Sequence, residues 1–155
     1  MSHYLIIGSG LIGRLTAWRL IRAGYQVTLL SKDDKTGSDS AGFVAASMVA
    51  PLTEAVTAEP LVKTIGMRSY QLWPKWLSEL EARVFYQNEG TLVVAHQGDK
   101  AEMERFDRRA KHVLADSDYV QLDKAALSLR EPELAERFDQ AMWFEKESCI
   151  DNRQL

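Results

Sequence analysis

The chain has 155 residues, of which 46% are hydrophobic and 26% are charged. This composition is typical of a globular protein, and a formal net charge of −3 offers no basic surface for nucleic acid or an anionic membrane. The lone cysteine, Cys149, excludes an internal disulfide, and no apolar run is long enough to span a bilayer. A single cysteine fits a reducing compartment, so we expect a cytoplasmic protein. The 3 histidines are scattered, so we expect no metal site.

The chain opens with an apolar run that leads into a glycine-rich turn. Residues 4–7 are typical of a buried strand, and a Gly-x-Gly-x-x-Gly motif follows directly. In such a motif the first glycine permits a tight turn, the second lets the backbone approach a pyrophosphate, and the third lets the helix pack close to the strand. The helix N-terminus offers unpaired N–H groups to phosphates. This pattern predicts a dinucleotide-binding unit with contacts from Gly8, Ser9, Gly10, Leu11, Ile12 and Gly13.

An amphipathic helix is predicted over residues 11–23, followed by a second strand over residues 27–30. The short helical connection makes the two strands parallel. A Rossmann unit usually has an acidic ribose ligand at the end of this strand, but Ser31 is in that position. We interpret Ser31 and Lys32 as cofactor contacts, which leaves NADP open, and Asp33 as a solvated loop residue rather than a displaced ribose ligand.

Small, apolar residues dominate the stretch 41–53. Small side chains allow a chain to pass close to a large flat ligand, whereas a buried helical turn packed on the sheet is the other interpretation. A long amphipathic helix is predicted over residues 59–81, with Pro74 expected to kink or interrupt it.

The second half of the chain alternates short β-type runs with charged helical patterns. Residues 84–87 and 91–95 are predicted to form a hairpin or two neighbouring strands around a turn at residues 88–90. Three further elements are predicted by periodicity: a charged surface helix over 99–115, a short helix that starts near Asp123, and a strand over 141–144.

Taken together, four stretches resemble the amino-terminal part of the D-amino-acid-oxidase-like flavoproteins, in particular the glycine oxidase and thiamine-biosynthesis oxidase branch. They occur in the family's order along the whole chain, and the second is much more specific than the glycine motif. The stretches are Gly-Ser-Gly-Leu-Ile-Gly at 8–13, Ala-Ala-Ser-Met-Val-Ala-Pro at 45–51 with Glu54, Leu-Arg-Glu-Pro-Glu-Leu at 129–134, and Cys-Ile-Asp-Asn-Arg-Gln-Leu at 149–155.

The resemblance implies FAD as the cofactor, with its pyrophosphate at the glycine motif. It also implies oxidation of a small-molecule amine or amino acid to an imine that then hydrolyses, with the flavin supplying the redox chemistry. The family's substrate-binding residues would lie beyond Leu155, so no catalytic residue is assigned. Ser47 stands where the family has a glycine, and the isoalloxazine ring would lie near Ala45, Ala46, Ser47 and Met48.

The predicted fold class is α/β. A Rossmann-like FAD-binding βαβ unit with an incomplete parallel sheet comes first, and the beginning of an α+β substrate domain follows. The first strand of such a sheet needs a neighbour on each side, and the sequence supplies only one clearly. We therefore expect a piece of a larger oxidoreductase, or a chain completed by a protein partner. The predicted division is an FAD-binding part at 1–80, a substrate-domain part at 81–147 and a return segment at 148–155.

Three other functions stay open from the sequence alone. A flavoprotein could modify a side chain of a partner protein instead of a small molecule. An NADP-dependent reductase is favoured by Lys32 but opposed by Gly13 and the 45–51 stretch. A non-catalytic interaction module would bind no nucleotide at all, so a flavin absorbance spectrum separates it from the flavoproteins.

Overall fold

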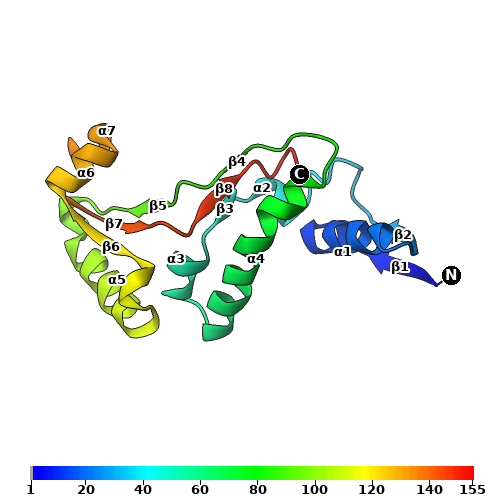
Figure 1. Cartoon of the computed structure of the whole chain (residues 1–155), viewed down its shortest axis with the longest axis horizontal. Coiled ribbons are helices and arrows are strands. Elements are labelled where there is room, and N and C mark those ends of the chain that lie inside the picture. Colours follow the sequence, from blue (N-terminus) through cyan, green and yellow to red (C-terminus); the bar gives the residue numbers. More distant parts are fainter. Residues whose placement is uncertain (1) are drawn as a thin grey trace. The chain divides into compact units, whose positions relative to one another are not determined.

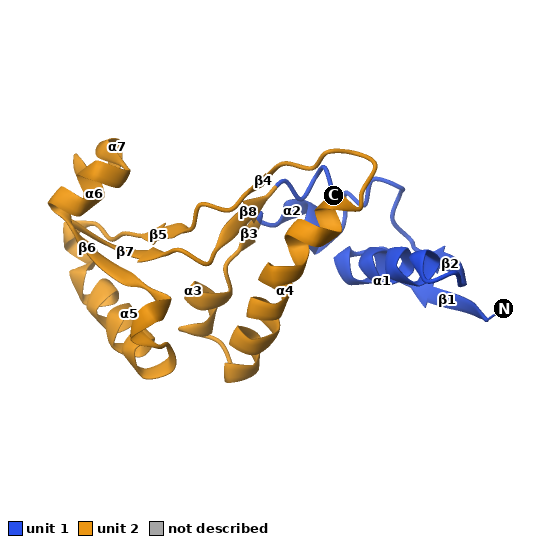
Figure 2. Ribbon diagram, viewed as in Figure 1, with its two compact units in different colours: residues 1–47, 151–155 blue, residues 48–150 orange. Residues whose placement is uncertain are grey.

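The computed structural model describes residues 2–155 (Figure 1). Contacts within the chain divide it into two compact units, residues 1–47 with 151–155 and residues 48–150 (Figure 2). One parallel and two antiparallel sheets are present, which confirms the mixed α/β class. The division at residues 80 and 147 concerns the domains of a complete protein and stays a prediction.

The first unit is a βαβ motif followed by a loop and a short helix. Strands β1 (His3–Ile7) and β2 (Gln26–Leu30) are parallel, with His3 opposite Gln26 and Ile7 opposite Leu30. Helix α1 (Leu11–Arg22) connects them, as the periodicity predicts. The short helix α2 (Ala41–Val44) and the terminal residues 151–155 complete the unit.

The two-stranded sheet of the first unit is open to solvent. Within residues 2–155, β1 pairs only with β2, so its other edge has no partner strand. Ile7 is 79% exposed, although a strand of this composition is normally covered on both faces. Other large apolar residues of the two strands are also exposed: Tyr4, Leu5, Leu29 and Leu30.

The second unit contains two three-stranded antiparallel sheets and most of the helices. One sheet has the order β3–β8–β4, and the other has the order β5–β7–β6. The strands are β3 (Met48–Val49), β4 (Tyr86–Gln87), β5 (Thr91–Val93), β6 (Val120–Asp123), β7 (Gln140–Phe144) and β8 (Ser148–Ile150). The helices are α3 (Pro51–Ala55), α4 (Pro60–Ser78), η1 (Gln97–Asp99), α5 (Lys100–Val113), η2 (Asp116–Asp118), α6 (Lys124–Arg130) and α7 (Pro132–Ala135).

The hairpin or pair of neighbouring strands predicted around residues 88–90 is wrong, because β4 and β5 belong to different sheets. Strand β4 pairs with β8 and β5 pairs with β7, so the two segments follow one another along one side of a ribbon (Figure 1). The register shifts by one residue between the pairs Gln87–Cys149 and Thr91–Phe144, as in a β-bulge. Gly90, at a φ of 81°, donates its N–H to the Glu147 carbonyl at this shift.

The main core of the second unit lies between the β5–β7–β6 sheet and helices α3 and α5. Phe144 is fully buried and stacks on Tyr119, with ring centroids 5.5 Å apart. Helix α5 contributes Met103 and Ala110 and keeps its charged residues outside, which confirms the predicted surface helix. The other buried members of this cluster are Leu52, Ala55, Val56, Leu114 and Met142.

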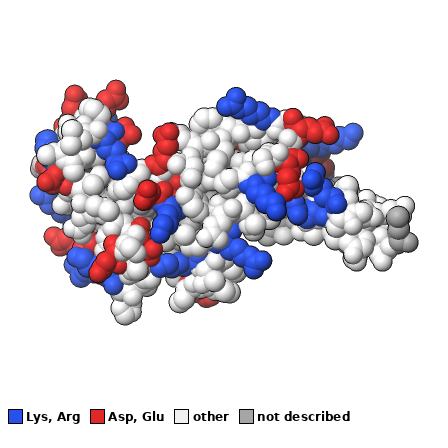
Figure 3. All heavy atoms as spheres, in the orientation of Figure 1, with Lys and Arg blue, Asp and Glu red and all other residues white. Residues whose placement is uncertain are grey.

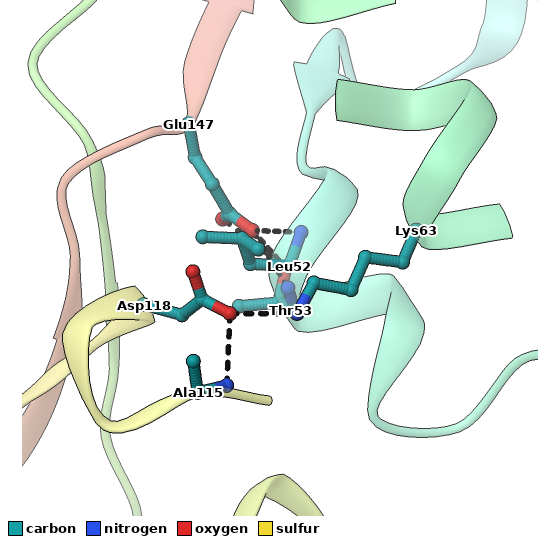
Figure 4. Close-up of polar contacts among 6 residues, drawn as sticks. All are labelled: Leu52, Thr53, Lys63, Ala115, Asp118 and Glu147. Carbon is teal, nitrogen blue, oxygen red and sulfur yellow. Dashed lines mark hydrogen bonds and ion pairs between the residues drawn. The ribbon is translucent and has the colours of Figure 1, made fainter. Parts of the chain in front are cut away.

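The buried carboxylate of Glu147 connects the segment between β7 and β8 to α3. Oε1 of Glu147 accepts the backbone N–H groups of Leu52 and Thr53, at 3.0 and 2.7 Å (Figure 4). These are the first-turn N–H groups of α3, which have no partner within the helix. Burial raises the pKa of Glu147, while the hydrogen bonds from Thr53, Thr91 and Leu52 oppose that rise. The carboxylate therefore caps α3 at an electrostatic cost.

An ion pair connects α4 to η2 in the same unit (Figure 4). Nζ of Lys63 lies 2.7 Å from Oδ2 of Asp118, which also accepts the Ala115 N–H. Burial alone would raise the pKa of Asp118, but the hydrogen bonds from Lys63 and Ala115 outweigh it and lower the pKa overall.

Helix α4 runs through Pro74, so the interruption considered from the sequence does not occur. Trp73 is buried and meets Trp76 edge to face, with ring centroids 5.7 Å apart. At Gly66, an added Cβ would lie 2.8 Å from Pro51, which shows that α4 packs tightly on α3. No helix within residues 2–155 combines the length and apolarity needed to cross a membrane.

Candidate cofactor site

The glycine turn is the segment of the Gly-x-Gly-x-x-Gly motif, residues 8–10, that connects β1 to α1, and its backbone is not covered by side chains at Gly8 and Gly10. Gly8 has a φ of 104°, a left-handed conformation that suits glycine, and its N–H donates to the Leu30 carbonyl at 2.8 Å. Gly10 is the N-cap of α1. A Cβ added to Gly8 or Gly10 would have no atom of residues 2–155 within 4 Å, apart from those of its own chain neighbours. The space beside this turn is therefore open at the N-terminus of a twelve-residue helix.

Gly13 has the role that the motif predicts for it. A Cβ on Gly13 would lie 1.9 Å from the carbonyl oxygen of Gly8. The helix therefore approaches the strand end more closely than any side chain allows. Leu11 and Ile12 are exposed at the head of α1, and Ile12 is 83% exposed.

The glycine turn is hydrogen-bonded to the end of β2. Ser9 is buried, and its Oγ donates to Oγ of Ser31 at 2.7 Å. Oγ of Ser31 also accepts the Asp33 N–H at 3.1 Å. A hydroxyl that accepts twice keeps its own hydrogen, so Ser31 can still donate to a ribose hydroxyl. The structure thus brings Ser9 and Ser31 together, and Lys32 beside them is exposed.

Arg14 connects the glycine turn to the loop after β2. Its Nε donates to the Ser9 carbonyl at 2.7 Å, and Nη2 donates to the Lys35 carbonyl at 3.0 Å. A Cβ on Gly37 would lie 2.4 Å from the same guanidinium. The sequence places Arg14 on the solvated side of the helix and gives no signal for this contact, because the loop conformation decides it.

The acidic residues after β2 organise their own loop. The carboxylate of Asp33 accepts the N–H groups of Asp34 and Asp39, at 2.9 and 3.2 Å. Oδ1 of Asp34 accepts from the Thr36 hydroxyl and from the N–H groups of Thr36 and Gly37. These bonds, the Thr36 hydroxyl first, lower the pKa of Asp34 below its usual value. Both carboxylates act as loop caps, in line with the loop interpretation of Asp33.

The two parts of the small-residue stretch differ in burial. Residues 41–49 are exposed or half-buried, whereas Ala50, Pro51 and Leu52 are buried at the start of α3. Ser40 caps α2 by accepting the Phe43 N–H at 3.2 Å. Ala45 and Ala46 after it are exposed, and Met48, the first residue of β3, is 54% exposed. A Cβ on Gly42 would lie 3.5 Å from Cβ of Leu11, so α2 contacts the head of α1 within the first unit.

Asn152 is the residue of this unit that sequence reasoning missed. Its side chain binds residues 42–47, more than 100 positions earlier in the chain. Oδ1 accepts from Oγ of Ser47 at 2.6 Å. Ser47 has a φ of 66°, the one positive value outside glycine among residues 2–155. Asn152 belongs to the return segment quoted for the family resemblance, but the pattern contains nothing that pairs it with Ser47.

Charges of both signs are interspersed over the face drawn in Figure 3, and strands β1 and β2 contain no Lys, Arg, Asp or Glu. Across the described residues 2–155, no three histidine, cysteine or carboxylate side chains lie close enough to hold a metal ion. The open glycine turn, with its helix N-terminus, is therefore the feature of the first unit suited to an anionic group.

Comparison with known families identifies the family of the chain. The sequence model described as "FAD dependent oxidoreductase" (DAO) matches residues 3–155. The chain belongs to the DAO family of FAD-dependent oxidoreductases. The family resemblance expected from the four stretches is thereby confirmed, and FAD is the cofactor of the family.

Curated relatives are consistent with this family. The chain is 37% identical over 150 residues to the thiamine biosynthesis oxidoreductase ThiO of Rhizobium etli, a match that covers 97% of this chain and 42% of the relative. It is 29% identical over 121 residues to a D-amino acid dehydrogenase of Methylobacterium radiotolerans, covering 74% of this chain and 29% of the relative. The chain thus spans less than half the length of these relatives.

Two solved structures share the fold of this chain. Glycine oxidase from Geobacillus kaustophilus matches 99% of this chain and 42% of its own, with a TM-score of 0.79 and 21% identity. Iminodiacetate oxidase from Chelativorans sp. BNC1 matches 99% of this chain and 42% of its own, with a TM-score of 0.74 and 24% identity. At these identities the comparison establishes the fold alone.

Proposed function

We propose that this chain is the amino-terminal FAD-binding part of an enzyme that oxidises an amine or an amino acid to an imine. The observation that carries the proposal is the open glycine turn at the head of α1, in a chain of a family that uses FAD. Glycine oxidase and D-amino acid dehydrogenase among its relatives support the substrate class.

The residues of the glycine turn fit a diphosphate. We assign the pyrophosphate of FAD to Gly8, Ser9 and Gly10, with the first N–H groups of α1 at Leu11 and Ile12 as further donors. An acidic side chain there would repel a phosphate, and the first turn of α1 contains none. Ser31 would donate to the adenosine ribose, and Lys32 would lie close to the same group. Gly13 has a packing role, because it lets α1 approach the turn.

We assign the ring side of the cofactor to Ala45, Ala46, Ser47 and Met48. The first two have small exposed side chains, which leave the backbone accessible to a flat ring. When bound, FAD would supply the redox chemistry as the hydride acceptor. The chain's own residues bind and orient the cofactor, and the groups that hold the substrate are proposed to lie in the remaining part of a longer protein.

The exposed sheet supports this view of a longer protein. Strand β1 has an unpaired edge, and Leu5 and Ile7 are 61% and 79% exposed. Parallel sheets are normally covered on both faces and central strands are paired on both edges. We infer that further strands, from the same polypeptide or from a partner, complete the sheet.

We propose that the protein works in the cytoplasm, because its free cysteine, Cys149, fits a reducing compartment.

The phosphate assignment is tested by Gly10→Val in the complete gene product. Gly10 has φ −66° and ψ 178°, values open to any residue, so valine adds bulk without backbone strain. We expect FAD affinity, followed by flavin fluorescence, to fall at least about tenfold because two methyl groups occupy the space of the phosphates.

Gly98→Val is the matched control. An added Cβ at Gly98 meets no described atom within 4 Å, and its φ lies outside the left-handed range. FAD affinity should be unchanged in this variant. Equal FAD affinity of the Gly10→Val protein and the wild type would overturn the phosphate assignment.

The reaction class is tested with the FAD-loaded complete protein. Glycine, an N-alkylglycine and a D-amino acid are supplied as substrates, and the carbonyl product of imine hydrolysis is measured. We expect one of them to reduce the flavin anaerobically. A flavin that none of the three reduces would contradict the amine or amino-acid assignment while leaving the FAD site intact.

A further inference from the structure

We propose that Asn152 is a positioning residue that fixes residues 45–47 for the flavin ring. The proposal rests on the proposed function, because it assigns Asn152 a role toward the ring side of the cofactor. It is carried by the contacts of one side-chain amide within the first unit, which link the terminal segment 151–155 to α2 and the residues after it.

The amide nitrogen of Asn152 satisfies the end of α2. It donates to the carbonyl oxygens of Gly42, Phe43 and Ala45, the last two at 3.3 and 3.0 Å. The last carbonyl groups of a helix have no partner within it, and α2 is only four residues long. One side chain thus holds the backbone from Gly42 to Ala45 in place.

The amide oxygen holds the next turn of the chain. Oγ of Ser47 donates to Oδ1 of Asn152 at 2.6 Å. Ser47 adopts a left-handed φ of 66°, which is unfavourable for a residue with a Cβ unless its surroundings enforce it. The hydroxyl contact with Asn152 is a restraint that favours this conformation. Donor and acceptor ends of one amide therefore fix both sides of Ala45 and Ala46.

The terminal segment is itself ordered around Asn152. Oδ1 of Asp151 accepts the Arg153 N–H at 3.0 Å and so forms the turn that presents Asn152. The guanidinium of Arg153 lies 5.5 Å from the ring centroid of Phe43. These contacts use carbonyl groups and a ring, and they leave Ala45 and Ala46 exposed. The restraint therefore acts on the segment without covering the surface offered to the cofactor.

The test compares FAD with ADP in the complete gene product. ADP reports on the glycine turn alone, whereas FAD also places a ring against residues 45–48. Asn152→Asp keeps an acceptor for Ser47 but replaces the amide donor with an oxygen that faces carbonyl groups. The matched control is Asn88→Asp at the other asparagine of the chain, which is exposed in the second unit.

We expect Asn152→Asp to weaken FAD binding at least about tenfold and to change the shape of the visible flavin spectrum, since one hydrogen bond to a fixed backbone corresponds to about that factor. ADP affinity should stay within about twofold of the wild type, because the glycine turn is untouched. Asn88→Asp should leave both affinities and the spectrum unchanged.

Two results would overturn the positioning role. Unchanged FAD affinity in Asn152→Asp would show that the amide does nothing for the ring, and an equal loss of ADP and FAD affinity would show a general structural defect. A wild-type protein that binds neither ligand would overturn the proposed function itself, and this proposal with it. If Asn152→Asp does not fold, Ser47→Ala decides: it should lower the FAD-to-ADP affinity ratio about threefold, and an unchanged ratio contradicts the role.

Discussion

At the scale of single residues, Gly13 shows how one missing side chain sets the geometry of the site. A methyl group there would lie 1.9 Å from the Gly8 carbonyl oxygen, so Gly13→Ala forces α1 away from the end of β1. We expect the free energy of unfolding to fall by about 1–3 kcal/mol, measured by urea denaturation of the complete protein. Gly98→Ala, with open space around it, is the control; equal midpoints for the two variants would contradict the packing role.

Ser47 allows backbone strain to be separated from the loss of its hydroxyl. Both Ser47→Ala and Ser47→Gly remove the hydrogen bond to Asn152, but only glycine relieves the φ of 66°. We expect the glycine variant to be more stable than the alanine variant by about 1 kcal/mol in thermal or urea unfolding. Equal stabilities would mean that the left-handed conformation costs nothing here.

At the scale of secondary-structure elements, regular patterns are readable from the sequence and pairings are not. Helices α1, α4 and α5 follow their apolar periodicity, and the glycine motif correctly predicts the strand–turn–helix around it. The turn residues 88–90 suggest a hairpin, yet the strands on either side pair with the distant strands β7 and β8. Local composition cannot reveal these partners, because they lie 49 to 64 residues further along the chain.

The candidate site has the same limit. The glycine turn is local, so the left-handed turn at Gly8 and the close packing at Gly13 follow from the motif, while its contact with a diphosphate stays a proposal. The contact between Ser47 and Asn152 depends on the return of the chain after 105 residues, which no local pattern encodes. Arg14 is equally hidden, since its partner Lys35 belongs to an irregular loop.

Because Glu147 caps α3 from a buried position, we expect the free energy of unfolding to depend on pH. Burial raises the pKa of this carboxyl above its ordinary value of 4.5, so the folded chain binds its proton more tightly than the unfolded chain. Between the ordinary and the raised value, the folded state holds more protons, and the free energy of unfolding falls as the pH rises. Glu147→Gln removes this titration and keeps an oxygen acceptor for the α3 N–H groups.

Urea unfolding at a series of pH values from 4 to 8 provides the measurement. The difference in unfolding free energy between Glu147→Gln and the wild type should change in favour of glutamine as the pH rises through the lower part of this range. A difference that stays constant with pH would show that the carboxyl does not titrate above its ordinary value in the folded state.

At the scale of the whole molecule, the open β1–β2 sheet predicts association of the chain when it is produced alone. Leu5, Ile7 and Leu30 are each more than half exposed, beside an unpaired strand edge. Such surfaces promote edge-to-edge pairing. Light scattering should show that residues 1–155 associate with increasing concentration, and that Ile7→Lys reduces this association. A monodisperse wild-type chain would contradict the inference that further strands cover the sheet.

The central claim is that the bare backbone at the head of α1 holds the diphosphate of FAD. The most direct measurement is the identity of the flavin released by denaturing the complete protein, after purification or after reconstitution. We expect FAD, retained by the wild type and lost in Gly10→Val. A colourless protein that takes up no FAD, or one that retains FMN in place of FAD, would contradict the claim, because FMN lacks the diphosphate and adenosine that the glycine turn is assigned to bind.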